Sequence, residues 1–88
     1  MDATLGQTIG FCAANQVVME LTYNGSVRNV EVYSYRANEK TNEQLLLCFE
    51  YEAGHTKSYK VDNIEHAKAT VNKFVPRWPI EIAGEPVQ

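Results

Sequence analysis

Hydrophobic and polar residues alternate along much of this chain with the two-residue period of half-buried β-strands. Residues 17–23 place Val17, Met19, Leu21 and Tyr23 on one face and Val18, Glu20 and Thr22 on the other, and Asn24-Gly25 follows them directly. This dipeptide is the strongest short signal for a hairpin with a type I′ turn, because both central residues of that turn need positive φ. The pattern therefore predicts a hairpin whose second strand covers residues 26–36.

The apolar phase of this second strand changes along its length. Val27 falls out of step with Val30 and Val32. A one-residue bulge would restore the phase and bend the strand, as the curved sheet of a small barrel requires. We expect that bulge near Arg28 or Asn29.

Three further strands are predicted downstream. After a polar loop at residues 37–42, residues 45–51 are apolar on both faces, which is typical of the most buried strand in a sheet. Residues 56–61 alternate again, and a short turn separates them from a last alternating stretch at residues 66–72. The chain is thus expected to hold five consecutive strands joined by tight turns.

The first residues show a helical spacing instead. Apolar residues recur every three or four positions from Leu5 onwards, and Thr4 and Gln7 are spaced as a capping box. These features predict a short helix over residues 5–14. Two glycines inside it cost up to about 1 kcal/mol each relative to alanine, so we expect the helix to depend on docking against the strands.

A helix followed by five short strands predicts a mainly β fold, a small five-stranded SH3-like or Sm-like barrel with a short N-terminal α-helix. An OB barrel is the near alternative. After the barrel, residues 17–72, the tail at residues 74–88 begins with two prolines among large apolar groups, which allows only an extended segment laid over the body. Trp78 is then an anchor on the chain itself or on a partner, and residues 84–88 are expected to fray.

The length and the net charge of the chain limit the classes of function that it can have. At 88 residues the chain has room for one domain with one core, and 44% hydrophobic residues exclude disorder. The net charge of −3 argues against a protein that simply coats nucleic acid. Residues 55–78 nevertheless hold five bases and two acids, while the remainder holds three bases and nine acids. This basic third is either a solvated face of mixed charge or a patch directed at a ligand.

The remaining composition predicts a cytoplasmic protein without metal or cofactor. No apolar run approaches the roughly 18 residues of a membrane span, and the first residues lack the pattern of a signal peptide. Cys12 and Cys48 fit small buried hydrophobes better than a disulfide, and with His55 and His66 they form no closed zinc set. Because so small a domain buries only about 60–70% of its unfolded surface, a homodimer is expected.

Two stretches carry a family resemblance: VEVYSYR, residues 30–36, and EQLLLCFEYEAGHTKSYKVDNI, residues 43–64. They contain a hydrophobic strand, a turn, a basic-aromatic strand and a closing Asp-x-Ile. In this order the chain resembles the WYL domain family. With the leading helix, the first hairpin and the tail, the similarity covers most of the chain, and it implies an Sm-like or SH3-like barrel.

The resemblance also implies a non-catalytic regulatory sensor. WYL domains are mostly the sensory parts of bacterial transcription regulators, and they are thought to bind nucleotides, single-stranded nucleic acid or other negatively charged ligands. A flat aromatic ring can stack on a base while a nearby cation meets phosphate. The candidates for such ligand contacts are Tyr33, Tyr35, Arg36, Lys57, Tyr59 and Lys60. Strand tyrosines also serve as cross-strand packing, and both interpretations stay open here.

The chain departs from the family pattern in ways that favour an alternative function. The Trp-Tyr-Leu triplet that names the family falls at Gln44-Leu45-Leu46, which keeps only the leucine, and Asn63 replaces an arginine. The single predicted helix supplies no helix-turn-helix. The alternative is a protein-interaction or assembly domain that has lost the ligand site.

Catalysis is not expected. An enzyme would need Cys48 as nucleophile with a histidine as base, but Cys48 lies in an apolar run, whereas a reactive thiol needs an exposed, electropositive site. The chain also lacks a glycine-rich phosphate loop and a nucleophile elbow.

Overall fold

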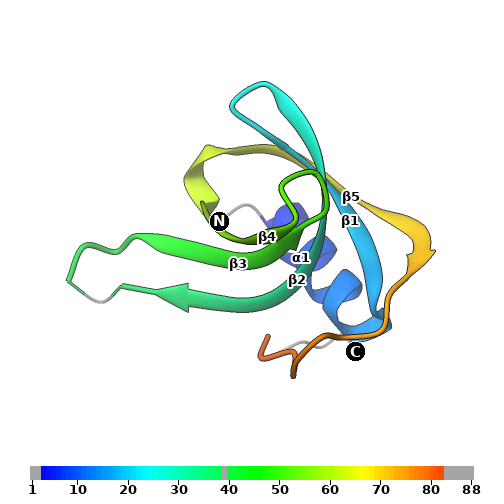
Figure 1. Ribbon diagram of the computed structural model, residues 1–88. Coiled ribbons are helices and arrows are strands. Elements are labelled where there is room, and N and C mark those ends of the chain that lie inside the picture. Colours follow the sequence, from blue (N-terminus) through cyan, green and yellow to red (C-terminus); the bar gives the residue numbers. More distant parts are fainter. Residues whose placement is uncertain (1–2, 39, 83–88) are drawn as a thin grey trace.

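The described residues form one α-helix, one short 3-10 helix and one sheet. The computed structural model describes residues 3–38 and 40–82. Its elements in chain order are α1 (Ala3–Asn15), β1 (Val17–Tyr23), β2 (Ser26–Ala37), β3 (Gln44–Glu50), β4 (His55–Lys60), the 3-10 helix η1 (Val61–Asn63) and β5 (Ile64–Lys73). The five predicted strands and the N-terminal helix are thereby confirmed, with η1 as the short turn before the last strand (Figure 1).

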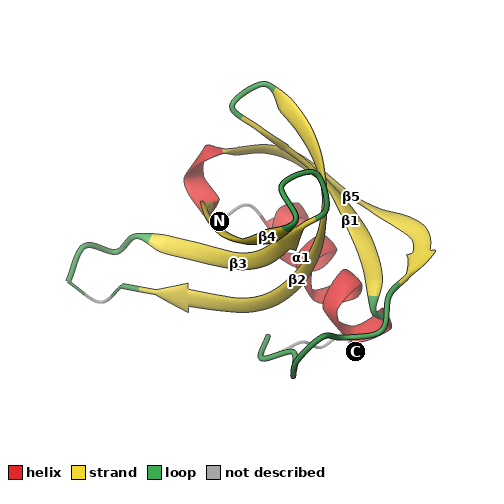
Figure 2. Cartoon of the chain, viewed as in Figure 1, coloured by secondary structure: helices red, strands yellow, loops and turns green. Residues whose placement is uncertain are grey.

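The sheet is antiparallel and open. Its strands follow the order β4-β3-β2-β1-β5, so the described parts of β4 and β5 each pair on one side only. The sheet curves, and α1 packs against β5, β1 and β2 (Figure 2). A mainly β domain behind an N-terminal helix is therefore present, whereas the hydrogen bonds that would close a barrel between β4 and β5 are not among those of the described strands.

The first hairpin has the predicted turn. Asn24 and Gly25 have φ values of 51° and 78°, and the pairing runs from Tyr23 opposite Ser26 to Met19 opposite Val30. Positive φ at both central residues is the requirement of a type I′ turn, whose twist matches that of the strands it joins. Local chemistry thus determines this hairpin and its register.

The predicted bulge lies elsewhere. Pairing between β1 and β2 is regular through Arg28 and Asn29, so the expectation of a bulge there is wrong. The irregularity is at Tyr33, between Val32 opposite Cys48 and Ser34 opposite Leu47. The apolar phase changes earlier because Val27 points to solvent, with 56% of its surface exposed near the hairpin tip.

The helix also begins earlier than the capping signal indicated. Because α1 starts at Ala3, Thr4 lies in its first turn rather than at the N-cap position that the predicted capping box assigns to it. The carbonyl of Thr4 accepts a hydrogen bond from the Thr8 hydroxyl at 3.0 Å. Neither α1 nor η1, the helices of the described residues, is long and apolar enough to cross a membrane.

The sheet has a core on each face. The main core lies between α1 and the sheet, and contains Ile9, Cys12, Ala13, Val17, Met19, Leu21, Val30, Val32, Leu46, Cys48, Tyr59 and Val61. The second core is smaller and contains Val18, Tyr33 and Phe74, with Phe49 and Ile80 packed against it. Both cysteines are free and buried in the main core, as the sequence predicted.

The tail, residues 74–82, is the extended segment that its prolines require. Its backbone is held by hydrogen bonds from the Phe74 amide to the Gln16 carbonyl, 2.9 Å, and from the Glu81 amide to the Tyr33 carbonyl, 2.6 Å. Trp78 stacks on the Tyr33 ring with centroids 4.7 Å apart, so the predicted anchor binds within the chain. The expected fraying of residues 84–88 lies outside the described residues.

Candidate functional site

The six predicted ligand residues are distributed over separate parts of the molecule. Lys57 and Tyr59 on β4 belong to a buried cluster around Glu50. Tyr33 on β2 belongs to a second cluster around Glu31. Tyr33 and Tyr59 are each only 1% exposed, so neither ring presents a face on which a base could stack.

The Glu50 cluster consists of Glu50, Tyr59, Lys57, Arg28 and Tyr23. The Glu50 carboxylate is buried, and its Oε1 accepts a hydrogen bond from the Tyr59 hydroxyl. The same oxygen lies 3.4 Å from Lys57 Nζ and 3.5 Å from Arg28 Nη1. Removing a carboxylate from water is costly unless cations and donors surround it, and this one has both.

The aromatic rings complete this cluster. Arg28 lies over the rings of Tyr23 and Tyr59, 5.6 and 5.8 Å from their centroids, and the two rings meet edge to face at 4.9 Å. Burial, together with the Glu50 carboxylate, raises the pKa of Tyr59, so its hydroxyl stays a donor. Burial alone would raise the pKa of Glu50, but the hydrogen bonds from Tyr59 and Lys57, together with the charges of Lys57 and Arg28, outweigh it and hold that pKa below its ordinary value.

This lowered pKa predicts a loss of stability in acid. In the unfolded chain Glu50 has its ordinary pKa of 4.5, and in the folded chain its pKa is lower. The cluster therefore contributes its full stability above pH 4.5 and loses it as the pH falls through the folded pKa. We expect the free energy of unfolding, measured by urea denaturation from neutral pH into acid, to fall more steeply for the wild type than for Glu50→Gln. Identical slopes for the two proteins would contradict this assignment.

The Glu31 cluster holds the tail against the outer face of the sheet. Glu31 is 2% exposed and accepts hydrogen bonds from the hydroxyls of Tyr33, at 2.5 Å, and of Tyr51. Arg77 of the tail places its Nε 3.2 Å from the same carboxylate, and its guanidinium lies 3.9 Å from the centroid of the Phe49 ring. The cluster therefore links β2, β3, the turn after β3 and the tail.

The protonation of the two phenols supports this role. Burial, with the nearby Glu31 carboxylate, raises the pKa of Tyr33 to about 12, although the hydrogen bond from the Arg77 amide opposes the shift. Burial and the hydrogen bond to Glu31 likewise raise the pKa of Tyr51 to about 12. Both hydroxyls thus remain protonated at neutral pH and donate to Glu31.

The other three predicted residues have separate partners. Tyr35 is partly buried and packs against the main core. Arg36 is exposed, with Nη2 4.0 Å from Oε1 of Glu81, and Lys60 Nζ lies 3.2 Å from Oε2 of Glu43. Of the six residues, the structure brings together Lys57 and Tyr59 around one carboxylate and gives each of the other four different contacts.

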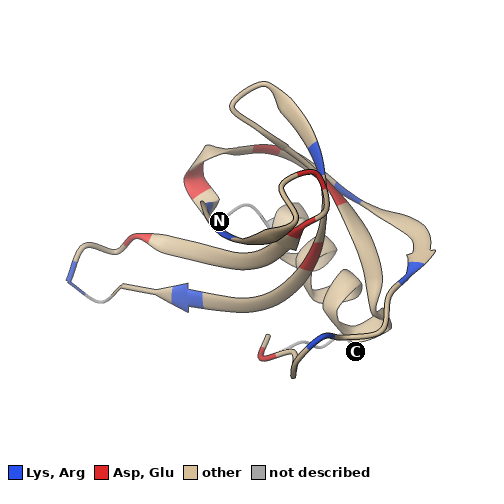
Figure 3. Ribbon diagram, viewed as in Figure 1, with Lys and Arg blue, Asp and Glu red and all other residues tan. Residues whose placement is uncertain are grey.

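The charge segregation of the sequence reflects pairing across the fold. Cations of the basic third pair with acids from outside it; Figure 3 marks the positions of both kinds of residue along the ribbon. The pairs are Lys57 with Glu50, Lys60 with Glu43, Lys68 with Glu20 and Arg77 with Glu31. The exposed pairs contribute little to stability, but they leave these bases less available for phosphate.

The carboxylates and two of their partners were missed at the level of sequence. Glu31 lies between two valines and Glu50 between Phe49 and Tyr51, so each acid interrupts an apolar strand. An acid in such a position needs partners when it is buried, and this is the signal that could have found both clusters. Nothing comparable marks Arg28 or Arg77 as those partners.

The described residues contain neither a reactive thiol nor a metal-binding cluster. Burial raises the pKa of Cys12 to about 11 and also raises that of Cys48, which keeps both as thiols. Among residues 3–38 and 40–82, no three histidine, cysteine or acidic side chains lie close enough together to hold a metal ion.

Comparison with known proteins adds no relative: no family model, no curated protein and no solved structure matches the chain.

Proposed function

We propose that this chain is a non-catalytic assembly domain that associates with copies of itself. The observation that carries the proposal is the exposure of large apolar side chains on a small domain. Phe11 is 51% exposed, Val71 93% and Val75 87%. A domain of this size has little buried surface to spare, and covering such side chains in a dimer would add to its core.

The arrangement of the predicted ligand residues supports assembly over ligand binding. The two tyrosines best suited to stacking are buried in cores, and Lys57 and Lys60 are each paired with a carboxylate. A nucleotide would have to displace these carboxylates and open the packing around the rings. Both steps oppose binding, because a buried charge or hydroxyl that loses its partner costs free energy.

The proposal also includes the type of β fold and the cellular location of the domain. The curved open sheet with η1 between its edge strands is consistent with an SH3-like or Sm-like barrel, whose closure would bring β4 toward β5. We place the domain in the cytoplasm, where two free buried cysteines remain reduced.

A nucleotide- or single-strand-binding sensor of the WYL type is the second candidate. One observation favours it: Arg28 and Lys57 lie side by side on the Glu50 carboxylate and both are partly exposed, although Glu52 is a second acid near Arg28. An anionic ligand would be attracted to these two cations. The sensor function predicts oligonucleotide binding that weakens as salt rises, whereas the assembly function predicts no such binding.

The test combines a measurement of the chain's oligomeric mass with a titration of a fluorescent oligonucleotide. We expect sedimentation of the purified full chain, over a range of about 1 μM to 1 mM, to show a reversible dimer, with half-dissociation in the micromolar range or weaker as for small interfaces. A fluorescent single-stranded oligonucleotide at low salt should show no binding. A monomer that binds the oligonucleotide with an affinity that falls as salt rises would replace assembly by the sensor function, because counterion release produces that dependence.

A further inference from the structure

The free edges of the sheet are poorly suited to pairing with another copy. β4 carries Lys57 and Lys60, and β5 carries Lys68 and Lys73. The pairing of β5 with β1 also shifts register twice, between Val17 and Met19 and between Thr22 and Tyr23. Lysines and irregularities are the usual features that keep edge strands from pairing with other chains. An assembly surface should therefore lie elsewhere.

The outer side of α1 has the opposite character. Residues 3–19 contain no aspartate, glutamate, lysine or arginine, although 22% of the whole chain is charged. Phe11 projects from this side of the helix, where the ring is exposed. Two chains of net charge −3 repel each other least where their facing surfaces carry no charge, so this side suits contact between identical copies.

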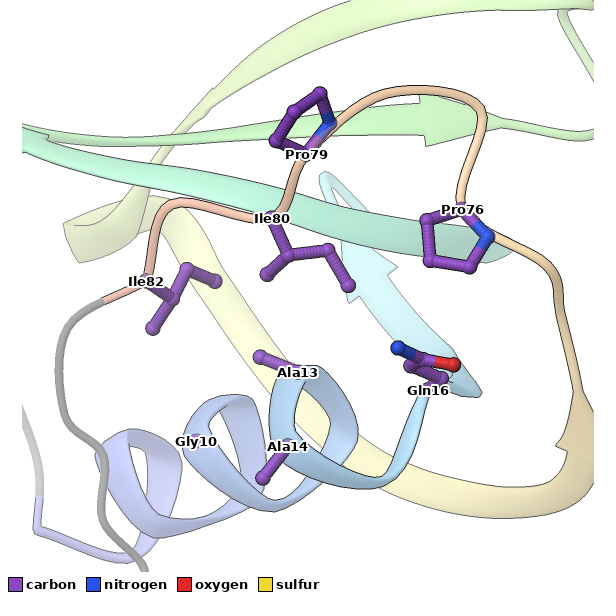
Figure 4. Close-up of a pocket in the computed structure, with 8 residues that line it drawn as sticks. All are labelled: Gly10, Ala13, Ala14, Gln16, Pro76, Pro79, Ile80 and Ile82. Carbon is purple, nitrogen blue, oxygen red and sulfur yellow. The ribbon is translucent and has the colours of Figure 1, made fainter.

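A pocket opens beside this side of α1. It has a volume of about 390 Å³ and lies between the helix and the tail, lined by Gly10, Ala13, Ala14, Gln16, Pro76, Pro79, Ile80 and Ile82. In Figure 4, Ile80 projects from the tail toward α1, while Gln16 and Pro76 stand at the other end of the space. A Cβ added to Gly10 would have no neighbour within 4 Å, so the helix leaves the pocket open there.

We propose that the pocket between α1 and the tail receives the Phe11 ring of a second copy of this chain. The inference rests on the proposed assembly function and specifies its surface. Phe11 and Ala14 are three residues apart in α1 and therefore neighbours on its surface, so the exposed ring stands next to the pocket. A two-fold axis across α1 would place each Phe11 in the other copy's pocket.

Size and symmetry support this pairing. A cavity of about 150 Å³ holds a benzene molecule, so this open pocket of about 390 Å³ has room for a phenyl ring. Because the ring and the pocket are neighbours on one surface, a two-fold axis brings each ring to the other copy's pocket at the same time, as a closed two-fold interface requires. α1 is only about 20 Å long, which places the contact at the small end of protein interfaces and predicts a weak dimer.

The test uses two variants on opposite sides of the contact. Phe11→Ala removes the ring, and Gly10→Leu fills the open space of the pocket while favouring the helix. Each should raise the dimer dissociation constant measured by sedimentation at least about tenfold, as truncation of a buried interface anchor does. Val27→Ala, which shortens an exposed valine on the β1–β2 hairpin, should dimerise like the wild type. Circular dichroism and thermal melting check that every variant is folded.

The outcomes separate this inference from the function it rests on. A wild-type dimer that both Phe11→Ala and Gly10→Leu weaken supports the α1 contact. If the wild type dimerises and both folded variants dimerise equally well, the α1 contact is wrong and assembly through another surface stands. A wild type that stays monomeric up to about 1 mM overturns both proposals.

Discussion

Replacing Tyr59 by alanine should lower the free energy of unfolding by about 3–5 kcal/mol, the cost of removing a large aromatic side chain from a core. The ring is buried in the main core and touches Tyr23, and its hydroxyl donates to the buried Glu50. The alanine variant would leave a cavity and take one donor from that carboxylate. Denaturation in guanidinium chloride measures the change, followed by the fluorescence of Trp78, the sole tryptophan.

The control for this prediction is Tyr59→Phe. It keeps the ring in the core and removes the hydroxyl alone, so we expect a loss of about 1–2 kcal/mol. The difference between the two variants measures the packing of the ring. A Tyr59→Ala protein as stable as the wild type but unable to bind a nucleotide would restore Tyr59 as a ligand contact and contradict its role in the core.

The elements that local chemistry determines could be predicted from the sequence. Asn24-Gly25 adopts positive φ at both positions because these residue types tolerate it, and the alternation of residues 17–23 fixes which side of β1 faces the main core. The helix could be predicted from its apolar spacing, although its start could not be fixed to the residue. Signals of this kind depend on neighbours a few positions away.

The position of the bulge could not be predicted in this way. It depends on how β2 pairs with β3 and on the tail, whose Phe74, Trp78 and Ile80 surround Tyr33. These contacts join residues about forty positions apart, and the pattern within β2 carries no record of them. Val27 is exposed because the hairpin tip extends beyond the core, and this exposed valine made the apolar pattern of β2 look as if it changed phase.

The candidate site shows the same division. The tyrosines and bases of β2 and β4 that were predicted to contact a ligand make many of the charged and aromatic contacts of the fold. What the sequence could not indicate is that the partners of Tyr33 and Tyr59 are Glu31 and Glu50. A buried carboxylate uses the same tyrosines and cations that an anionic ligand would use, so residue type alone does not separate the two.

Replacing Glu31 by alanine should have the second large effect: the free energy of unfolding falls by about 2–4 kcal/mol, because two hydroxyl donors lose their acceptor, and the tail is released. The substitution leaves the hydroxyls of Tyr33 and Tyr51 without their acceptor and Arg77 without its carboxylate. A buried donor without a partner costs about 1–3 kcal/mol. Because Trp78 stacks on Tyr33, its emission in the folded variant should move toward that of a solvated tryptophan.

Two further variants assign the effect within the cluster. Arg77→Ala breaks the link to the tail but leaves both hydroxyls bonded to Glu31, so it should change Trp78 emission in the same direction and cost less stability than Glu31→Ala. Glu81→Gln alters only an exposed pair with Arg36 and should cost at most about 1 kcal/mol. If Arg77→Ala is as destabilising as Glu31→Ala, the cost lies in the tail contact rather than in the two phenols. If Glu31→Ala leaves both stability and emission unchanged, Glu31 does not hold the tail, and the packing of Trp78, Phe74 and Ile80 must do so together with the tail's backbone hydrogen bonds.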